Sequence, residues 1–398
     1  MSKHISDRVL NLSESQTLAM AAKSRELQAQ GIDIISLSLG EPDFDTPDFI
    51  KEAAIEAIHN NFTHYPPVPG YLDVREAISK KFKRDNNLDY GPENILISTG
   101  AKQSLINVVL SLVNPGEEIL LPAPYWVSYH AMAEIAEAKP VIIPTSIEND
   151  FKITPEQLEA NINSNTRLMI FSSPCNPSGS VYTMDELEAL AEVAAKKEDF
   201  YIISDEIYEL INFSGNHASL GTIAKIKDRV ITVNGVAKGF AMTGWRLGYI
   251  GAPEWIVKAA AKIQGQFTSG ANTIAQMAAK AAVEANPSVT KLMQQTFLKR
   301  RDLILHELSK IEGMKLNVPQ GAFYVFPNVS SFFGKSYGAY NIQSASDIAL
   351  FLLEEAKVAI VTGEAFGNPN CIRLSYATSD DILIEAARRI KTALDKLN

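Results

Sequence analysis

Charged and amide side chains follow several apolar runs of this chain, at points where buried strands are expected to end. Asp205 closes the run FYIISD, Lys238 follows the run RVITVNG, and Arg246 comes eight residues later. Asn176 lies in the turn PCNPSG after another apolar run. A carboxylate at the end of a buried run is costly unless it meets a cation or a strong donor. An acid, an amine and a guanidinium on neighbouring strand ends therefore indicate one shared site.

Two further places favour the binding of anions. Ala101 and Lys102 follow the run NILIST and open a helix-like stretch, and free backbone N–H groups at a helix start suit a phosphate. Arg373 lies in the short apolar run CIRLSYATS. Its planar guanidinium suits a carboxylate, although a structural salt bridge is an equal alternative from this residue alone.

Each of these residues also has an ordinary interpretation when it is taken singly. Lys238 resembles a solvated surface lysine, Asp205 a helix N-cap, and Asn176 a turn residue. Their combination is more specific. A phosphate site, an acid for a pyridine nitrogen and an amine that can form a Schiff base are what pyridoxal phosphate requires from a protein.

The elements that must position these residues are seven short apolar runs separated by helix-like segments. Most of the runs lack polar alternation, which predicts strands covered on both faces in a mainly parallel α/β sheet. Ligands of such sheets bind beyond the carboxyl ends of the strands. The runs span residues 94–99, 118–122, 140–144, 167–174, 200–208, 229–235 and 248–252. The helix-like segments include residues 100–113, 183–197 and 255–264, and Thr183 with Glu186 predicts a capping box.

The pattern changes near residue 290. A helix-like stretch at 288–310 is followed by short β-like runs and a closing helix at 380–397. We therefore predict an N-terminal arm that is partly in the small domain (1–45), a large α/β domain (46–290) and a small α+β domain (291–398). The short runs of the small domain span residues 314–318, 322–327, 358–362 and 371–376.

Composition excludes several classes of protein. The 398 residues carry a formal charge of −9 without a basic block, which argues against nucleic-acid binding. No apolar run is long enough for a membrane span, and the first residues lack a secretory core. Two cysteines fit a reducing cytoplasm, and the histidines lack zinc-ligand spacing, so we expect a cytoplasmic protein without a metal. No Walker or GxGxxG motif appears.

The chain resembles the class I aminotransferases of pyridoxal phosphate fold type I, and most of all the bacterial aspartate aminotransferases of subgroup Ib. The resemblance covers nearly the whole chain and implies a large domain with a seven-stranded, mainly parallel sheet. The motifs that carry it are GEPDFDTP, YPPVPG, GAKQSL, PYWVSY, SSPCNPSG, SDEIYE, NGVAKGFAMTGWRLGY, GAFYVF and RLSYATS.

The resemblance implies a role for each matching residue. Lys238 matches the lysine that forms a Schiff base with pyridoxal 5′-phosphate and carries the proton of the reaction. Asp205 matches the partner of the pyridine nitrogen, and Asn176 with Tyr208 matches the pair that bonds the phenolic oxygen. Trp126 matches the aromatic residue stacked on the ring, where a core tryptophan is the alternative.

Further matches concern the phosphate and the partner subunit. Arg246 and the backbone of Ala101 and Lys102 match the phosphate cradle. Tyr65 matches a tyrosine that reaches the phosphate of a neighbouring subunit, which implies a homodimer with interfacial active sites. Relatives commonly carry Ser or Thr three residues before the lysine, whereas this chain has Gly235, so the source of that phosphate donor is left open.

The resemblance also implies the substrate contacts. Gly40 and Arg373 match binders of the α-carboxylate, with Trp126 and Asn176 beside them. Lys102 matches a lysine thought to meet a distal carboxylate, and a phosphate-loop cation is the alternative. Ser15 and Gln16 lie near a hydroxyl helper in the arm. Cys175 and Cys371 are interpreted as small buried side chains.

These matches predict ping-pong transamination between aspartate or glutamate and 2-oxoglutarate or oxaloacetate. An aromatic or prephenate aminotransferase is the main alternative. A pyridoxal-phosphate-dependent β-lyase, a cofactor-binding regulator without turnover and a nucleotide-binding α/β protein are weaker alternatives, since the chain lacks a basic DNA-binding segment and a GxGxxG loop.

Overall fold

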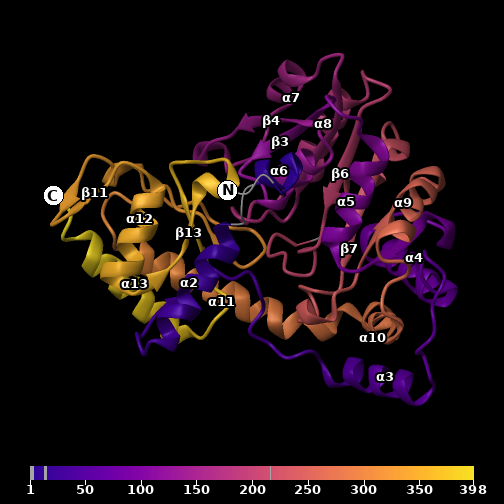
Figure 1. Ribbon diagram of the computed structural model, residues 1–398, viewed down its shortest axis with the longest axis horizontal. Helices are drawn as coiled ribbons and strands as arrows, with labels where there is room; N and C mark the ends of the chain where they lie inside the picture. Colours follow the sequence, from indigo (N-terminus) through magenta and orange to yellow (C-terminus); the bar gives the residue numbers. More distant parts are fainter. Residues whose placement is uncertain (1–3, 13–15, 216) are drawn as a thin grey trace.

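The computed structural model describes residues 4–12, 16–215 and 217–398 and is built around a seven-stranded sheet (Figure 1). The strand order is β2-β8-β7-β6-β5-β3-β4, and β8 runs antiparallel to both of its neighbours. The predicted mainly parallel sheet is thereby confirmed. Its strands are β2 (Ile95–Ser98), β3 (Glu118–Ala123), β4 (Lys139–Pro144), β5 (Thr166–Ser172), β6 (Tyr201–Asp205), β7 (Val230–Gly235) and β8 (Gly248–Gly251).

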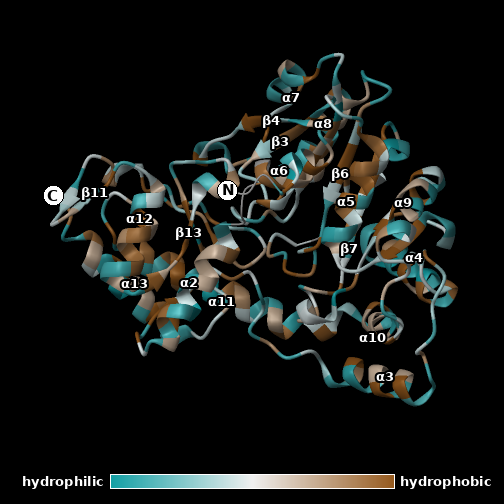
Figure 2. Cartoon of the chain, viewed as in Figure 1, coloured by the Kyte–Doolittle hydropathy of each residue, from teal (hydrophilic) through white to brown (hydrophobic). Residues whose placement is uncertain are grey.

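Helices pack on both faces of this sheet, and successive strand residues point to opposite faces. Ile119 and Leu121 of β3 pack on one face, and Leu120 between them packs on the other. Figure 2 shows the hydrophobic residues of β6 between the helical layers. The first face is covered by α5 (Ala101–Leu112), α6 (Ser128–Ile135) and α9 (Glu254–Phe267). The opposite face is covered by α7 (Pro155–Asn161), α8 (Met184–Ala194), α4 (Leu72–Asn86) and α10 (Thr273–Glu284).

Local sequence explains where these helices begin. The hydroxyl of Thr183 accepts a hydrogen bond from Glu186 N at 3.2 Å, and the Glu186 carboxylate accepts one from Thr183 N at 2.8 Å. This is the predicted capping box at the start of α8. A helix outside the predicted set, α3 (Asp48–His59), packs on α10 and extends along the lower edge of the molecule in Figure 1.

The small domain has its own hydrophobic core and lies on the left of Figure 1. Its three-stranded sheet has the order β13-β14-β9. Its elements are α11 (Lys291–Leu308), β9 (Tyr324–Val325), β10 (Ser336–Tyr337), β11 (Tyr340–Asn341), α12 (Ala345–Phe351), β12 (Val358–Ala359), β13 (Val361–Thr362), β14 (Ile372–Ser375) and α13 (Asp380–Leu394).

The N-terminal segment joins this small domain. After α1 (Asp7–Asn11) and α2 (Gln16–Ala29), the two-residue strand β1 (Ile35–Ser36) pairs in parallel with β12, with Ile35 opposite Val358. The pairing supports an arm that belongs partly to the small domain, and the boundaries at residues 45 and 290 stay predictions.

One predicted strand is wrong. Residues 314–318 form only a single bridge, between Lys315 and Asn328. This bridge is not extended into a strand pair, because the N–H groups of Gln320 and Gly321, which follow it, bond to Gly179 O at 2.8 and 2.9 Å. In the described ranges of the chain, every helix is too short or too polar to cross a membrane.

Candidate active site

The strand ends and the small domain together line a cavity of about 350 Å³. Ten of the eleven site residues predicted from the sequence lie on its wall. The exception is Tyr65, whose side chain is 94% exposed and does not contact the cavity. The ten are Gly40, Ala101, Lys102, Trp126, Asn176, Asp205, Tyr208, Lys238, Arg246 and Arg373.

Asp205 ends strand β6 and is 4% exposed. The hydroxyl of Tyr129 donates to its Oδ2 at 2.7 Å, and the backbone N–H of Ile207 donates to its Oδ1 at 3.2 Å. Burial outweighs these bonds and raises the pKa of Asp205 to about 6. A buried carboxylate of this kind gains from a positively charged group placed against it.

Lys238 follows strand β7, and its half-buried amine donates a hydrogen bond to Gly40 O. Burial lowers the pKa of Lys238 to about 8, and Glu41 opposes this effect. The positive charges of Arg373 and Arg246 lower the pKa further. At pH 7 about a tenth of such amines are neutral, against well under a hundredth for an ordinary lysine. Lys238 therefore has the properties of a nucleophile and a proton carrier.

Arg373 lies on strand β14 and is only 2% exposed. Its Nη1 donates to Asn176 Oδ1 at 2.9 Å and its Nη2 to Ser38 O at 2.5 Å. The guanidinium carbon lies 4.6 Å from the Tyr324 ring centroid and 4.9 Å from that of Phe366. These rings hold the planar group in place at the cavity wall. Its Nε has no partner in the part of the chain that the structure describes.

Tyr208 is buried, and its hydroxyl lies 2.7 Å from the hydroxyl of Tyr324. Tyr324 also leaves no room for a side chain at Gly40. A Cβ built there would lie 2.1 Å from Tyr324 Oη. The glycine thus lets the backbone of residue 40 approach both Tyr324 and the Lys238 amine.

An open backbone cradle lies at the start of α5. Gly100 adopts a positive φ of 80°, and a Cβ there would lie 2.5 Å from Arg246 Nη2. A Cβ on Gly248 would lie 2.2 Å from Ala101 N. The absence of both side chains leaves the helix N–H groups and the Arg246 guanidinium accessible, which suits a phosphate. Gly235 has little room for a side chain, because a Cβ there would lie 3.0 Å from Gly248 Cα. The missing Ser or Thr phosphate donor is therefore not easily placed at this position.

The cavity lining also contains an aromatic residue and a further cation. Lys102 Nζ lies 4.9 Å from the Trp126 ring centroid, and Trp126 meets Tyr129 edge to face at 5.6 Å. Thr17 and Leu18 of α2 also line the cavity. Gln16, near the expected hydroxyl helper, lines a separate groove, and Ser15 lies outside the described residues.

Sequence reasoning missed several residues of the site. Tyr129 bonds Asp205, Tyr324 bonds Tyr208, and Ser172 presents a buried hydroxyl without a partner among the described residues. A signal was available for two of them. Tyr129 follows Trp126 by three residues in PYWVSY, and Tyr324 lies in GAFYVF. The two cysteines are buried and free, as predicted.

Comparisons with known proteins agree with this geometry. Residues 32–390 match the family described as aminotransferase class I and II. A bifunctional aspartate aminotransferase and glutamate/aspartate-prephenate aminotransferase from Petunia hybrida is 46% identical, over 98% of this chain and 82% of that protein. An aspartate/prephenate aminotransferase from Nitrosomonas europaea is 46% identical, over 98% and 99%.

Solved structures give the same result. The aspartate aminotransferase from Rhizobium meliloti superposes with a TM-score of 0.96 at 38% identity, and all of both chains is covered. The aspartate aminotransferase from Thermus thermophilus, solved with maleate, has a TM-score of 0.92 at 39% identity, over 98% of this chain and 100% of that one.

Proposed function

The chain belongs to the class I and II aminotransferases, and from this premise we propose that it transfers the amino group of L-aspartate or L-glutamate to a 2-oxo acid with pyridoxal 5′-phosphate as its cofactor. The observation that carries the proposal is the meeting of Lys238, Asp205 and Arg373 on one cavity. An amine of lowered pKa, a buried acid and a buried guanidinium supply the three functions that amino-acid chemistry on this cofactor needs.

The residues present fit this cofactor. Any residue other than glycine at position 100 or 248 would place a side chain inside the cradle at the start of α5. With both glycines present, the cradle offers backbone N–H groups and the Arg246 guanidinium to a phosphate. Asp205 would hold the ring nitrogen, and Asn176 with Tyr208 would hold the phenolic oxygen. The half-buried Trp126 would stack on the ring. Bound there, pyridoxal phosphate supplies an aldehyde for the amino group and a ring that accepts the electron pair of the substrate Cα–H bond.

The chain's own residues supply the proton transfers and the orientation. Lys238 Nζ, with a pKa of about 8, would take the Cα proton and deliver it to the former aldehyde carbon of the cofactor within the same half-reaction, and it would carry a proton the opposite way in the second half. Arg373 orients the α-carboxylate through two parallel hydrogen bonds, with Gly40 beside it. The aromatic rings around Arg373 exclude water from this end of the cavity.

The acidic side chain of the substrate would meet Lys102. Lys102 and Arg373 both line the cavity, so it offers two cations, one for each carboxylate of a dicarboxylate. The Thermus thermophilus structure was solved with maleate, a dicarboxylate, which supports the same choice of substrate class.

An absorption spectrum of the purified protein, repeated after addition of L-aspartate, tests the proposal. We expect a yellow cofactor band that converts to the pyridoxamine band. A yellow band that ignores both aspartate and glutamate would exclude acidic donors. A protein that stays colourless with added pyridoxal phosphate would overturn the assignment of the whole site.

The role of Lys102 is tested by Lys102→Ala, with rates measured for aspartate and for phenylalanine. We expect the aspartate rate to fall at least about tenfold more than the phenylalanine rate, because one charge-assisted bond is lost with aspartate alone. Lys262→Ala, which removes an exposed lysine of α9, is the matched control. An equal loss for both substrates would leave Lys102 as a phosphate-loop cation only.

Prephenate is a second candidate amino acceptor. The names of the Petunia and Nitrosomonas relatives include prephenate, and both cover at least 98% of this chain. Conversion of the pyridoxamine form back to the yellow form by prephenate, without 2-oxoglutarate, would establish this activity.

The working form would be a homodimer in the cytoplasm. Tyr65 extends into solvent, and Ile55 and Ile58 on α3 are 46% and 52% exposed, which is costly for an isolated chain. We expect a dimer in sedimentation experiments and weaker cofactor binding in Tyr65→Phe. A monomer with full activity would exclude sites shared between subunits.

A further inference from the structure

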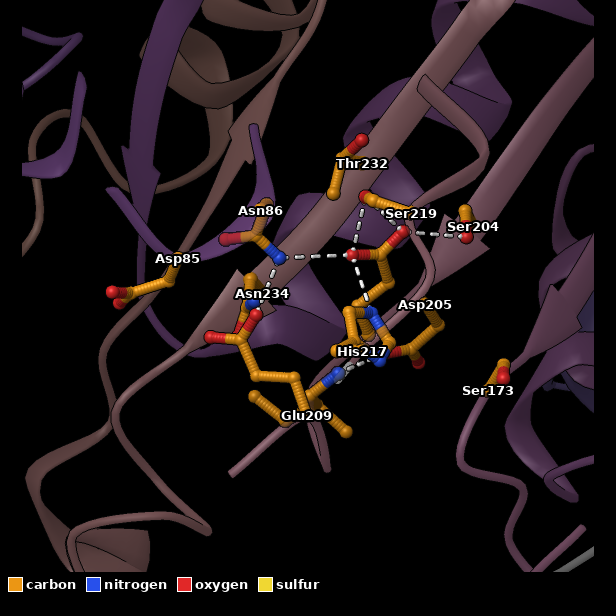
Figure 3. A network of polar contacts seen from close by, with 12 residues as sticks. Asp85, Asn86, Ser173, Ser204, Asp205, Glu209, His217, Ser219, Thr232 and Asn234 are labelled. Atoms are coloured by element: carbon orange, nitrogen blue, oxygen red, sulfur yellow. Dashed lines mark hydrogen bonds and ion pairs between the residues drawn. The ribbon is translucent and has the colours of Figure 1, made fainter. Parts of the chain in front are cut away.

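A cluster of buried charged residues lies behind the cavity and has no part in the reaction as described so far. The segment that carries Asp205 and Tyr208 has two faces. Those two residues line the cavity, whereas Glu206 and Glu209 point into the cluster. A turn fixes this alternation, since Glu209 N donates to Glu206 O at 2.9 Å. We call this group the Glu206 cluster; it comprises Lys81, Asn86, Ser204, Glu206, Glu209, His217 and Ser219 (Figure 3).

Glu206 is the centre of the cluster and is fully buried. Its carboxylate accepts hydrogen bonds from Ser204 Oγ at 3.0 Å, Ser219 Oγ at 2.7 Å and Asn86 Nδ2 at 3.3 Å. His217 Nε2 lies 2.8 Å from its Oε2. The hydroxyl and amide partners act as donors here, and this arrangement stabilises an ionised carboxylate away from water.

Glu209 belongs to a second ion pair within the cluster. It contacts Lys81 Nζ directly and accepts a bond from Asn86 Nδ2 at 2.6 Å, while Lys81 also donates to Asn86 Oδ1 at 2.7 Å. Burial raises the pKa of Glu209, but Lys81 and His217 outweigh it and hold that pKa below its usual value. The three potential metal ligands Glu206, Glu209 and His217 lie within 4.8 Å of one another, yet the Lys81 ammonium already provides a cation there.

His217 decides the net charge of the cluster. It faces Glu206 and Glu209 from its own loop, and Lys81 faces it from α4, where Asp85 lies 4.0 Å from the Lys81 amine. Burial lowers the pKa of His217, but the two glutamates outweigh it and raise that pKa above its usual value. With His217 protonated the two glutamates are balanced by two cations. With His217 neutral one negative charge is left over.

We propose that Glu206 and His217 are positioning residues that set the electric field behind Asp205 and, through it, the protonation of the cofactor that Asp205 would hold. Only one peptide unit separates Asp205 from Glu206, and His217 acts through Glu206, since its Nε2 lies 2.8 Å from the Glu206 carboxylate. The negative charge of Glu206 adds to burial in raising the pKa of Asp205. The coupling to the ring nitrogen rests on the proposed function, whereas the charge balance within the cluster does not.

The test is a charge cycle on the cofactor-loaded protein, with Glu206→Gln, His217→Gln and the double variant. The readout is the pH at which the absorption band of the bound cofactor shifts, measured between about pH 5 and 9. Loss of the His217 charge makes the field more negative and favours the protonated cofactor, so we expect this pH to rise by about half a unit or more. Loss of the Glu206 charge should lower it by a similar amount, and the double variant should return close to the wild-type value.

Opposite shifts separate this role from a merely structural one. Two shifts in the same direction, or none, would overturn the coupling to Asp205. His306→Gln, which removes an exposed histidine of α11, is the matched control and should leave the pH unchanged. Absence of any cofactor band in the wild-type protein would overturn the proposed function, and with it the coupling.

Thermal unfolding of the same four proteins tests the charge balance independently of the cofactor band. Removing one partner leaves a buried charge unpaired, whereas removing both does not. We therefore expect the double variant to unfold at a higher temperature than at least one of the single variants, a result that also holds if a single variant folds poorly. Additive losses would overturn the charge balance. A change in unfolding temperature on adding EDTA would show instead that the cluster holds a metal ion.

Discussion

Replacement of Gly40 by alanine is expected to disturb the site because Tyr324 occupies the space that a Cβ needs. The Cβ would lie 2.1 Å from Tyr324 Oη, whereas ordinary contacts begin at 3.4 Å. The two groups must therefore separate by about 1.3 Å. Tyr324 has little freedom to move, since it is 1% exposed, bonds Tyr208 at 2.7 Å and stacks on Arg373.

The magnitude follows from two contributions. Overpacking of a buried site by one methyl group costs about 1–3 kcal/mol, and loss of the hydrogen bond between Tyr208 and Tyr324 costs about 1 kcal/mol. Gly40→Ala should thus lower the free energy of unfolding by about 2–4 kcal/mol. In a Tyr324→Phe background the nearest atom is Cζ at 3.1 Å, so a shift of a few tenths of an ångström suffices. There the same substitution should cost about 1 kcal/mol or less.

Urea denaturation of the four proteins of this cycle, at one fixed cofactor concentration, measures the difference. Gly244→Ala is the control, because a Cβ at Gly244 would meet nothing within 4 Å and its φ is not positive. We also expect Gly40→Ala to raise the Michaelis constant for aspartate, since Tyr324 cannot move without disturbing Arg373. The steric explanation is refuted if Gly40→Ala costs the same with and without the Tyr324 hydroxyl.

Three further predictions concern single residues. Burial raises the pKa of Asp205 from 3.8 to about 6, so the cofactor-free protein binds an extra proton in this range and loses stability as pH rises through it. Asp205→Asn should remove this loss, worth up to about 3 kcal/mol above pH 6, and parallel pH–stability curves for the two proteins would contradict this. Arg373→Ala should raise the Michaelis constant about 100-fold or more for every amino donor without changing the cofactor band, and an unchanged constant would remove Arg373 from the substrate site. Thr183→Ala should lower the free energy of unfolding by about 1 kcal/mol through loss of the capping box, and a loss below about 0.3 kcal/mol would show that Glu186 compensates.

The large domain was predictable from the sequence because its strands are buried on both faces. Strand β5 is apolar and buried from Leu168 to Phe171, and such a continuous run is visible without any alignment. The chemistry follows from the same rule. Parallel strands end at one edge, so Asp205 and Lys238 had to lie close together once their strands were placed.

The rest of the site depends on contacts that no local pattern records. Tyr324 belongs to a strand of two residues, too short for a period, and it reaches Tyr208 only because the small domain packs against the large one. The helix α4 is different, since Val74, Ile78 and Phe82 are buried at helical spacing. The helical spacing of these apolar residues is present in the sequence, but the many charged residues between them make the helix hard to recognise.

The pairing of β1 with β12 has a consequence for how this chain is made. Residues 35–36 leave the ribosome early, but their partners at 358–359 follow more than three hundred residues later. The hydrogen bond from Arg373 to Ser38 O spans 335 positions in the same way. The arm therefore stays unpaired while the large domain folds, and the substrate site is completed only when nearly all of the chain has been synthesised.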